Sequence, residues 1–456
     1  MKTDMDREQL FISVPVGQAV ISLAVPTVIS QLITVVYNMA DTFFIGQLGD
    51  PNQVAAATLA MPVFIFLTAF SNLFGIGGAS LISRCLGVGD REKAKRVSSF
   101  CIWCAAALAL CYGLAVVAAK DWLLPLLGAD AATGEYCASY ILWTIGIGAV
   151  PTVLNAELAH LVRAEGYSGQ ASFGVAFGGV LNMVLDPIFI FLFQMDIAGA
   201  AIATMLSNVA ATVYFFGFLY QIRQGSVITP SPKCFALKRD VSLEVLAVGL
   251  PSFIMTLMST LSNLTLNKTI SGYSNEAVAG MGIAKKIDLT AFAIAQGMTQ
   301  GTLPLIGYNY SSGDRRRMLS AVKVLLVDCL VLAFAGLGLM YLGAAPITRC
   351  FINDEATVAY GRDFLRIVCL ACPTTALNFL AITIFQATGQ KVQPLILSLL
   401  RKGGLDIPLM LAFNGAVGIR GVAWATPLAD GLALIVSAAL LLPYLKKLMQ
   451  TQPVQG

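Results

Sequence analysis

The sequence predicts an all-α polytopic membrane protein with twelve transmembrane helices, which form two six-helix lobes related by a pseudo-twofold axis along the membrane normal. The first observation is the composition: 57% of the 456 residues are hydrophobic and 12% are charged, whereas a soluble protein has about 25% charged residues. The second is that apolar runs long enough to cross a bilayer, about 20 residues, recur along the whole chain. The third is an internal repeat.

The two halves of the chain carry matching motifs at a separation of 222–225 residues. The pairs are Leu23–Pro26 with Val248–Pro251, Gly89–Asp90 with Gly313–Asp314, Arg163–Gly166 with Gln386–Gly389, and Ile197–Thr204 with Ile419–Thr426. Six helices in each repeat give both repeats the same membrane orientation, so the axis that relates them runs along the membrane normal. A duplicated bundle of this kind is typical of secondary transporters.

Twelve apolar runs predict the spanning helices, because backbone polar groups inside a bilayer must be hydrogen-bonded within their own segment. In the N-terminal lobe, residues 1–222, the runs are 17–46, 54–82, 96–119, 136–162, 168–194 and 198–222. The two lobes are joined by a cytoplasmic linker at 223–241, which is rich in Pro, Lys and Ser and is the longest polar stretch away from the termini. In the C-terminal lobe, residues 242–456, the runs are 242–270, 277–307, 319–342, 357–388, 392–414 and 420–445.

The loops between these runs alternate between basic loops and loops that are acidic or nearly neutral. The basic set comprises Lys2, Arg7, Arg84, Arg91, Lys93, Lys95, Arg96, Arg223, Lys233, Lys238, Arg239, Arg315, Arg316, Arg317, Lys323, Lys446 and Lys447. The positive-inside rule places these loops and both termini in the cytoplasm. We therefore expect a multi-pass protein that is embedded in the lipid bilayer of the cytoplasmic (inner) membrane. Because topology explains the basic runs, no nucleic-acid partner is expected.

Acids deep in the N-terminal lobe are the first candidates for a functional site, because a charge inside a bilayer costs about 2.5–3.5 kcal/mol on insertion scales. In the first helix, Asp41 shares one face with Thr34, Tyr37 and Asn38, since residues three or four apart are neighbours on a helix. Pro26 removes a backbone hydrogen bond from the same helix and permits a kink.

The fifth and sixth helices add oxygen atoms to this set. Asn182 and Asp186 are four residues apart and share a face, and Thr204 contributes a hydroxyl. Hard cations take oxygen ligands, and a set without imidazole or thiolate disfavours a transition metal. Two interpretations stay open: the set binds Na⁺, or Asp41 and Asp186 share a proton, because neighbouring like charges oppose each other's ionisation. The structural alternative is that both acids cap helix ends or bond to nearby hydroxyls.

Other ionisable residues inside the predicted spans are weaker candidates. On the fourth helix, Glu157, His160 and Arg163 are spaced by three residues, which predicts a ladder along one face. His160 is the only histidine of the chain. It is a candidate proton relay, although a hydrogen bond between helices is the simpler interpretation.

The C-terminal lobe has a polar patch of its own. Its members are Lys285 and Asp288 on the eighth helix, Arg401, Lys402 and Asp406 on the eleventh, and Asp430 on the twelfth. Asp406 occupies the position that Asp186 has in the first lobe. The segment that corresponds to Asp41, however, is Asn263–Asn267 and contains no acid. We therefore assign the cation site to the N-terminal lobe.

Together these residues resemble the multidrug and toxic compound extrusion (MATE) family, in the superfamily of multidrug, oligosaccharidyl-lipid and polysaccharide exporters. The resemblance covers essentially the whole chain and rests on Pro26 through Asp41, Arg163–Gly166, Asn182–Pro187, Gly199–Thr204 and Gly297–Tyr310. It implies an antiporter that couples entry of H⁺ or Na⁺, with no other cofactor, to export of cationic or amphipathic organic compounds. Alternating access by a rocker-switch motion of the lobes is expected, and two fused lobes make a monomer sufficient.

The resemblance also assigns roles to residues. In the branch with acids only in the first lobe (DinF-like), the positions linked to cation coupling match Asp41, Asn182, Asp186 and Thr204. A second branch has acids in the seventh and tenth helices, but the stretch Cys372–Asn378 of the tenth helix contains no acid here, so we expect the first branch. The first-helix residues assigned to gating and to the cavity are Pro26, Gln31, Thr34, Tyr37 and Asn38.

Two other functions compete with this one. A lipid-linked saccharide flippase of the same superfamily needs a strongly basic cavity for a pyrophosphate. The acids of the first lobe argue against it, whereas four cations of the second lobe favour it: Lys285, Lys286, Arg401 and Lys402. A polytopic membrane enzyme needs a convergent set of catalytic groups. The sequence contains no His-Glu-x-x-His, Gly-x-Ser-x-Gly or Gly-Lys-Ser/Thr motif, so we expect a protein that is not an enzyme.

Overall fold

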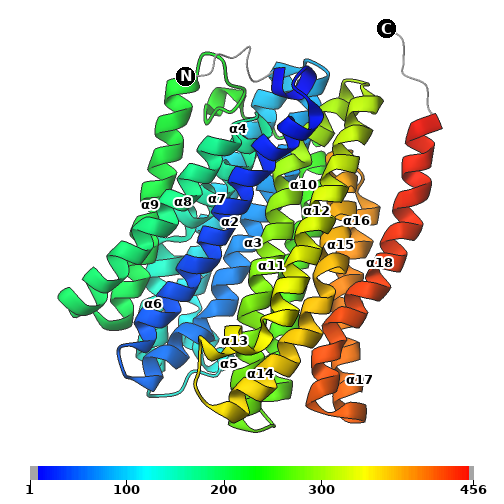
Figure 1. The fold of residues 1–456 in the computed structure, drawn as a ribbon. Helices are drawn as coiled ribbons and strands as arrows, with labels where there is room; N and C mark the ends of the chain where they lie inside the picture. Colours follow the sequence, from blue (N-terminus) through cyan, green and yellow to red (C-terminus); the bar gives the residue numbers. More distant parts are fainter. Residues whose placement is uncertain (1–8, 451–456) are drawn as a thin grey trace. The chain divides into compact units, whose positions relative to one another are not determined.

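The computed structural model describes residues 9–450, and every regular element in this part of the chain is a helix (Figure 1). The first half contains α2 (Val16–Gly46), α3 (Pro51–Gly87), α4 (Arg91–Ala118), α5 (Lys120–Leu127), α6 (Gly134–Ile141), η1 (Leu142–Ile147), α7 (Ala149–Ala164), α8 (Ser168–Pro187), η2 (Ile188–Leu192) and α9 (Asp196–Ile222). The second half contains η3 (Pro232–Cys234), α10 (Arg239–Ile270), α11 (Asn275–Ser311), α12 (Arg315–Leu342), α13 (Ala344–Arg349), α14 (Glu355–Val368), η4 (Cys369–Ala371), α15 (Cys372–Ala387), α16 (Val392–Leu399), η5 (Leu400–Asp406), α17 (Ile407–Val417) and α18 (Ile419–Gln450).

The helices confirm the predicted fold class. Within residues 9–450, nine helices are long and apolar enough to cross a membrane, and a tenth span is a helix pair bent by 53°. The two other predicted spans, 277–307 and 392–414, fall in α11 and in α16 to α17, which carry several charged residues. The chain ends, including Lys2 and Arg7, lie outside the described residues, so the cytoplasmic placement of the termini stays a prediction.

Three of the predicted continuous helices are interrupted by π-helical turns. The fourth predicted span is divided by η1, where the Gly148 amide donates to the Trp143 carbonyl, five residues earlier. The fifth passes into η2 directly after Pro187, which has no N–H and crowds the preceding turn. The eleventh contains η5, which ends at Asp406. Such turns reorient side chains locally and are frequent at functional sites.

The described helices form two compact units, and two helices belong to both of them. Unit 1 consists of residues up to Ser13 and of Ile29–Phe253, and unit 2 consists of Val14–Val28 and the chain from Ile254 onward. The chain therefore passes between the units within α2, two residues after Pro26, and within α10, two residues after Pro251. These units are groups of packed residues, whereas the predicted lobes are sequence repeats, so the lobe boundaries stay a prediction.

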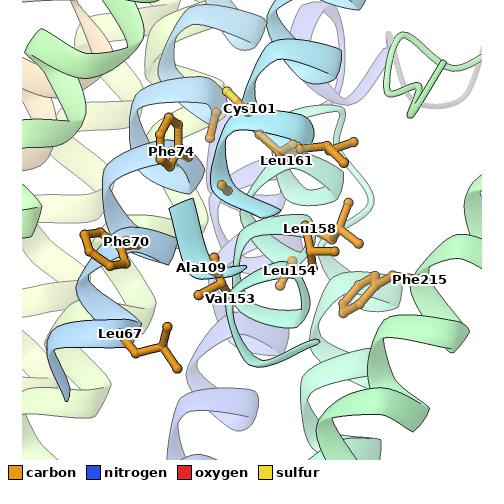
Figure 2. Close-up of a cluster of buried hydrophobic side chains, with 14 of the residues drawn as sticks. Leu67, Phe70, Phe74, Cys101, Ala109, Val153, Leu154, Leu158, Leu161 and Phe215 are labelled. Atoms are coloured by element: carbon orange, nitrogen blue, oxygen red, sulfur yellow. The ribbon is translucent and has the colours of Figure 1, made fainter. Parts of the chain in front are cut away.

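The core of unit 1 lies between α3, α4, α7 and α9. Figure 2 shows Leu67, Phe70 and Phe74 of α3 beside α4 and α7. Phe215 of α9 is fully buried and closes the same cluster. Within unit 1, the first part of α10 packs closely on α3, because a Cβ atom at Gly77 would meet the backbone of Val245. Small residues allow this close approach between membrane helices.

Unit 2 repeats this arrangement. The first part of α2 packs on α11, where a Cβ atom at Gly301 would lie 2.7 Å from the Leu23 carbonyl oxygen. The position of Gly301 in the second repeat corresponds to that of Gly77 in the first, at the separation of the predicted motifs. A glycine thus permits close packing in each unit: Gly77 of α3 admits the first part of α10, and Gly301 of α11 admits the first part of α2.

Candidate functional site

The oxygen set predicted from the sequence is contained in unit 1. Asn182 and Asp186 lie on α8 and are both buried. The Asn182 Nδ2 group donates to Asp186 Oδ1 at 3.1 Å and to Thr204 Oγ1 of α9 at 3.3 Å. Three of the four predicted cation-coupling residues are therefore joined by direct hydrogen bonds.

Asp41 approaches this group from α2. Its charge and that of Asp186 are close enough to interact. The approach of the two helices depends on Gly179 of α8, where a Cβ atom would lie 2.8 Å from Cδ1 of Tyr37. Glycine at this position lets the polar face of α2 reach the buried acid of α8.

Three oxygen atoms of this group are buried without a hydrogen-bond partner: Asp41 Oδ1, Asn182 Oδ1 and Asp186 Oδ2. Buried polar atoms in proteins are nearly always paired, so each exception needs an explanation. Neither acid caps a helix, because Asp41 lies inside α2 and Asp186 lies inside the continuous run of α8 and η2. Chemically, the unpaired oxygens suit a cation or a proton shared between the two carboxyl groups.

One residue near this site was not predicted from the sequence. Tyr140 of α6 lies within electrostatic range of Asp41, Asp186 and Tyr37. Its own carbonyl accepts a 2.6 Å hydrogen bond from Thr144, at the start of the π-helical turn. No local pattern identifies Tyr140, because its relation to the acids comes from the packing of α6 and not from spacing along one helix.

The first-helix residues assigned to gating are divided between the units. Pro26 lies in the part of α2 that belongs to unit 2, whereas Gln31, Thr34, Tyr37 and Asn38 belong to unit 1 with Asp41. The Thr34 hydroxyl donates to the Ser30 carbonyl at 3.0 Å, and Tyr37 lies within electrostatic range of Asp41. The predicted kink position therefore lies before the point where α2 passes from unit 2 to unit 1, between Val28 and Ile29, and the predicted cavity face lies after it.

The predicted ladder on α7 forms only in part. Arg163 Nη1 lies 3.4 Å from His160 Nδ1. Glu157 is fully buried, and both of its carboxyl oxygens have no hydrogen-bond partner. Glu157 therefore takes no part in the predicted ladder.

The predicted polar patch of the C-terminal lobe lies in unit 2 and is paired internally. Asp406 accepts a hydrogen bond from Ser262 of α10 at 2.7 Å and forms an ion pair with Lys402 at 3.1 Å. Arg401 forms an ion pair with Asp430 of α18 at 2.7 Å. Lys285 lies 3.8 Å from Asp288 within α11. Unlike Asp186, Asp406 thus has a cationic partner.

Comparisons with known proteins give one consistent result. The family model described as MatE matches residues 26–188 and 251–411. The chain is 32% identical over 443 residues to the multidrug export protein MepA of Staphylococcus saprophyticus and 31% identical over 443 residues to MepA of Staphylococcus aureus strain NCTC 8325. Each comparison covers 97% of both chains.

Solved structures with a similar fold cover the same length. One is a crystal structure of MATE in complex with MaL6, with a TM-score of 0.91, 25% identity, and coverage of 97% of this chain and 99% of that chain. Another is an outward-facing multidrug resistance MATE family transporter of the MOP superfamily, with a TM-score of 0.91 and 25% identity. That comparison covers 97% of this chain and 98% of the other.

Proposed function

Because the chain belongs to the MatE family, we propose that it is an antiporter that exchanges Na⁺ or H⁺ for organic compounds. It is a multi-pass membrane protein and a multidrug efflux transporter, not an enzyme. The finer features that we propose are the coupling ion, its site in unit 1, and the alternating-access mechanism. We further propose cationic or amphipathic substrates, a functional monomer, and a location in the cytoplasmic membrane with both termini inside.

The observation that carries this proposal is the group of three unpaired buried oxygens of Asp41, Asn182 and Asp186. Two carboxyl groups at such depth are costly when both are charged and nothing compensates them. A Na⁺ ion would complete its coordination with these oxygens, whereas a proton would neutralise one carboxyl and become a donor to the other. Either ion lowers the cost of bringing α2 against α8, so binding favours that arrangement.

A coupling ion shifts a conformational equilibrium only if it binds the two states with different affinity. Here the ion site is built from two elements, since Asp41 lies on α2 while Asn182 and Asp186 lie on α8. A movement of α2 away from α8 would separate the acids and dismantle the site. We propose that cation entry closes this group and that the resulting change in α2 releases the organic substrate outward.

We propose that such a movement bends the two helices that are shared by the two units. Each unit includes one part of α2 and one part of α10, so motion of one unit against the other has to bend these two helices. Pro26 and Pro251 each remove one backbone hydrogen bond two residues before the crossing point. We propose a rocker-switch motion in which both helices bend near these prolines.

The test is efflux of ethidium from liposomes that contain the purified full-length protein. An inward Na⁺ gradient at equal pH is compared with an inward H⁺ gradient in Na⁺-free buffer. The variant Asp41→Asn removes one ionisable group and keeps the side-chain shape. The control is Asp196→Asn, because Asp196 is exposed and its backbone φ of 51° is one that asparagine also adopts.

We expect one gradient to drive efflux in the wild type and in Asp196→Asn, and at least a tenfold lower rate in Asp41→Asn. The effective gradient identifies the coupling ion. Intact gradient-driven efflux by a folded Asp41→Asn variant would refute the assignment of the cation site.

A further inference from the structure

The acid site of unit 1 has a counterpart in the second repeat, and this counterpart lies within unit 2. Asp406 follows a leucine as Asp186 does, and Thr426 occupies the position of Thr204 in the repeated motif. Asp186 and Thr204 belong to unit 1, whereas Asp406 and Thr426 belong to unit 2. The two sites can therefore be compared residue by residue.

Hydrogen bonds beside the two sites show that the repeated positions also correspond in space. In unit 1, Asn208 of α9 donates to the Thr152 hydroxyl of α7 at 3.1 Å. In unit 2, Asp430 of α18 accepts a hydrogen bond from the Thr375 hydroxyl of α15. Thr375 and Asp430 are the repeat counterparts of Thr152 and Asn208, so the same two positions meet in each unit.

The two sites differ at the residue one helical turn before the acid. In unit 1 this residue is Asn182, a neutral amide that donates to Asp186 Oδ1 at 3.1 Å, while Asp186 Oδ2 has no hydrogen-bond partner. In unit 2 it is Lys402, whose Nζ group donates to Asp406 Oδ2 at 3.1 Å. Both side chains of this ion pair are largely buried, at 13% and 2% exposed. The acid of unit 2 is thus bonded to a cation that is part of the chain.

A second lysine is bonded to the hydroxyl of the unit 2 site. In unit 1 the Thr204 hydroxyl accepts a hydrogen bond from Asn182 at 3.3 Å. In unit 2 the Thr426 hydroxyl accepts one from Lys285 Nζ of α11 at 3.2 Å, and Lys285 also lies within electrostatic range of Asp406. The two groups that the neutral amide bridges in unit 1 therefore have ammonium partners in unit 2.

The charges around Asp406 balance only when Lys402 is counted. Three cations and three anions lie together: Lys285, Arg401, Lys402, Asp288, Asp406 and Asp430. Arg401 is bonded to Asp430 at 2.7 Å, which leaves Lys402 as the directly bonded cation of Asp406. Loss of the Lys402 charge would leave one negative charge uncompensated, and an uncompensated buried charge is strongly destabilising.

The space beside Lys402 suits a single small ion and excludes an organic compound. Lys402 and Thr426 line a cavity of about 30 Å³, and one buried water molecule needs about 10–15 Å³ of such space. Asp406 Oδ1 is buried without a hydrogen-bond partner. An ion in the place of the ammonium would therefore find free oxygen atoms, which hard cations take as ligands.

We propose that Lys402 is a tethered substitute for the coupling cation. Its ammonium group balances Asp406 in every state of the transport cycle, so unit 2 takes up no ion and coupling passes through unit 1 alone. Replacement of Lys402 by asparagine, the residue of unit 1, opens a second site that binds a free Na⁺ ion. The role in coupling rests on the proposed function, whereas the cation site opened in the variant does not.

The test is thermal unfolding of the purified full-length protein in detergent at mildly alkaline pH, in NaCl or in choline chloride of equal concentration. Every variant also carries Asp41→Asn, which removes an acid of the unit 1 site. Lys402→Asn removes the tethered cation, and Lys402→Arg keeps it. The matched control is Lys286→Asn, because Lys286 is a neighbouring exposed lysine on α11 that does not line the cavity.

We expect Lys402→Asn to unfold at a lower temperature than its Asp41→Asn parent in choline chloride and to regain at least half of this loss in NaCl. The parent, Lys402→Arg and Lys286→Asn should each unfold at the same temperature in both salts. Addition of Asp406→Asn to Lys402→Asn removes the uncompensated charge and should abolish the response to Na⁺. An ion pair with only a structural role would give a loss that Na⁺ does not restore.

Three results would overturn the proposal. The first is an equal unfolding temperature of Lys402→Asn in the two salts. The second is a response to Na⁺ that persists when Asp406→Asn is added. The third is failure to recover folded Lys402→Asn in either salt while the variant with Asp406→Asn folds. Recovery of Lys402→Asn only when Na⁺ is present throughout purification would support the proposal.

Failure of this inference can be told apart from failure of the proposed function. Gradient-driven efflux that requires Asp41, together with a Lys402→Asn variant that does not respond to Na⁺, would remove only the tethered cation. A response to Na⁺ that depends on Asp406, without efflux by the wild type on either gradient, would leave the cation site of the variant and remove the antiporter.

Discussion

Replacing Gly301 by alanine should destabilise unit 2, although alanine is the better helix former. The added Cβ atom would lie 2.7 Å from the Leu23 carbonyl oxygen and 2.8 Å from the Ala24 Cα atom, whereas ordinary contacts begin near 3.4 Å. The first part of α2 would therefore have to move away from α11 by about 0.7 Å. Because both neighbours are backbone atoms, no change of side-chain rotamer relieves the contact.

The size of the effect follows from two opposing terms. Overpacking of this kind costs about 1–3 kcal/mol, and backbone neighbours place Gly301 at the upper end. Alanine gains about 1 kcal/mol over glycine inside a helix. The net loss is therefore about 2 kcal/mol. At Gly338 of α12 nothing lies within 4 Å of an added Cβ atom, so Gly338→Ala should be stabilised by about 1 kcal/mol.

The assay is the free energy of unfolding, obtained by titrating the purified protein with a denaturing detergent and following tryptophan fluorescence. Gly301→Ala and Gly338→Ala should differ by about 3 kcal/mol, with opposite signs relative to the wild type. Two variants of equal stability would show that the close approach of α2 to α11 is not required, and the packing argument would fail.

Two further substitutions test buried charges. Glu157→Gln should change the free energy of unfolding by no more than about 1 kcal/mol, because an unpaired and fully buried carboxyl group is expected to be neutral. Glu157→Lys should instead prevent recovery of monodisperse protein. Recovery of monodisperse, folded Glu157→Lys would contradict this reasoning. Arg401→Met should cost about 3–5 kcal/mol by leaving the buried Asp430 carboxylate without its cation, and Arg401→Met with Asp430→Asn should recover most of that loss. Thermal unfolding of the single and double variants measures the loss and its recovery. A double variant that is no more stable than Arg401→Met would exclude the ion pair as the cause of the loss.

Local patterns in the sequence were sufficient for the membrane spans and for part of the site. The apolar runs correspond to helices because burial of apolar surface in lipid depends on composition and length within one segment. The hydrogen bond between Asn182 and Asp186 also follows from spacing, since residues four apart are neighbours on a helix. The same rule was insufficient on α7, where Glu157 has no partner despite its spacing from His160.

Which helices and side chains are neighbours could be seen only in the tertiary structure. Tyr140 lies within electrostatic range of Asp41 and Asp186, and the Ser262 hydroxyl donates to Asp406. In addition, α2 and α10 are each divided between two units. None of these relations is local in the sequence. Hydrophobic burial is not directional, so it selects which segments enter the membrane without selecting their neighbours. Neighbours are chosen by close packing, such as that of Gly179 on Tyr37 and of Gly301 on Leu23, and by the pairing of buried polar groups, which depend on three-dimensional geometry.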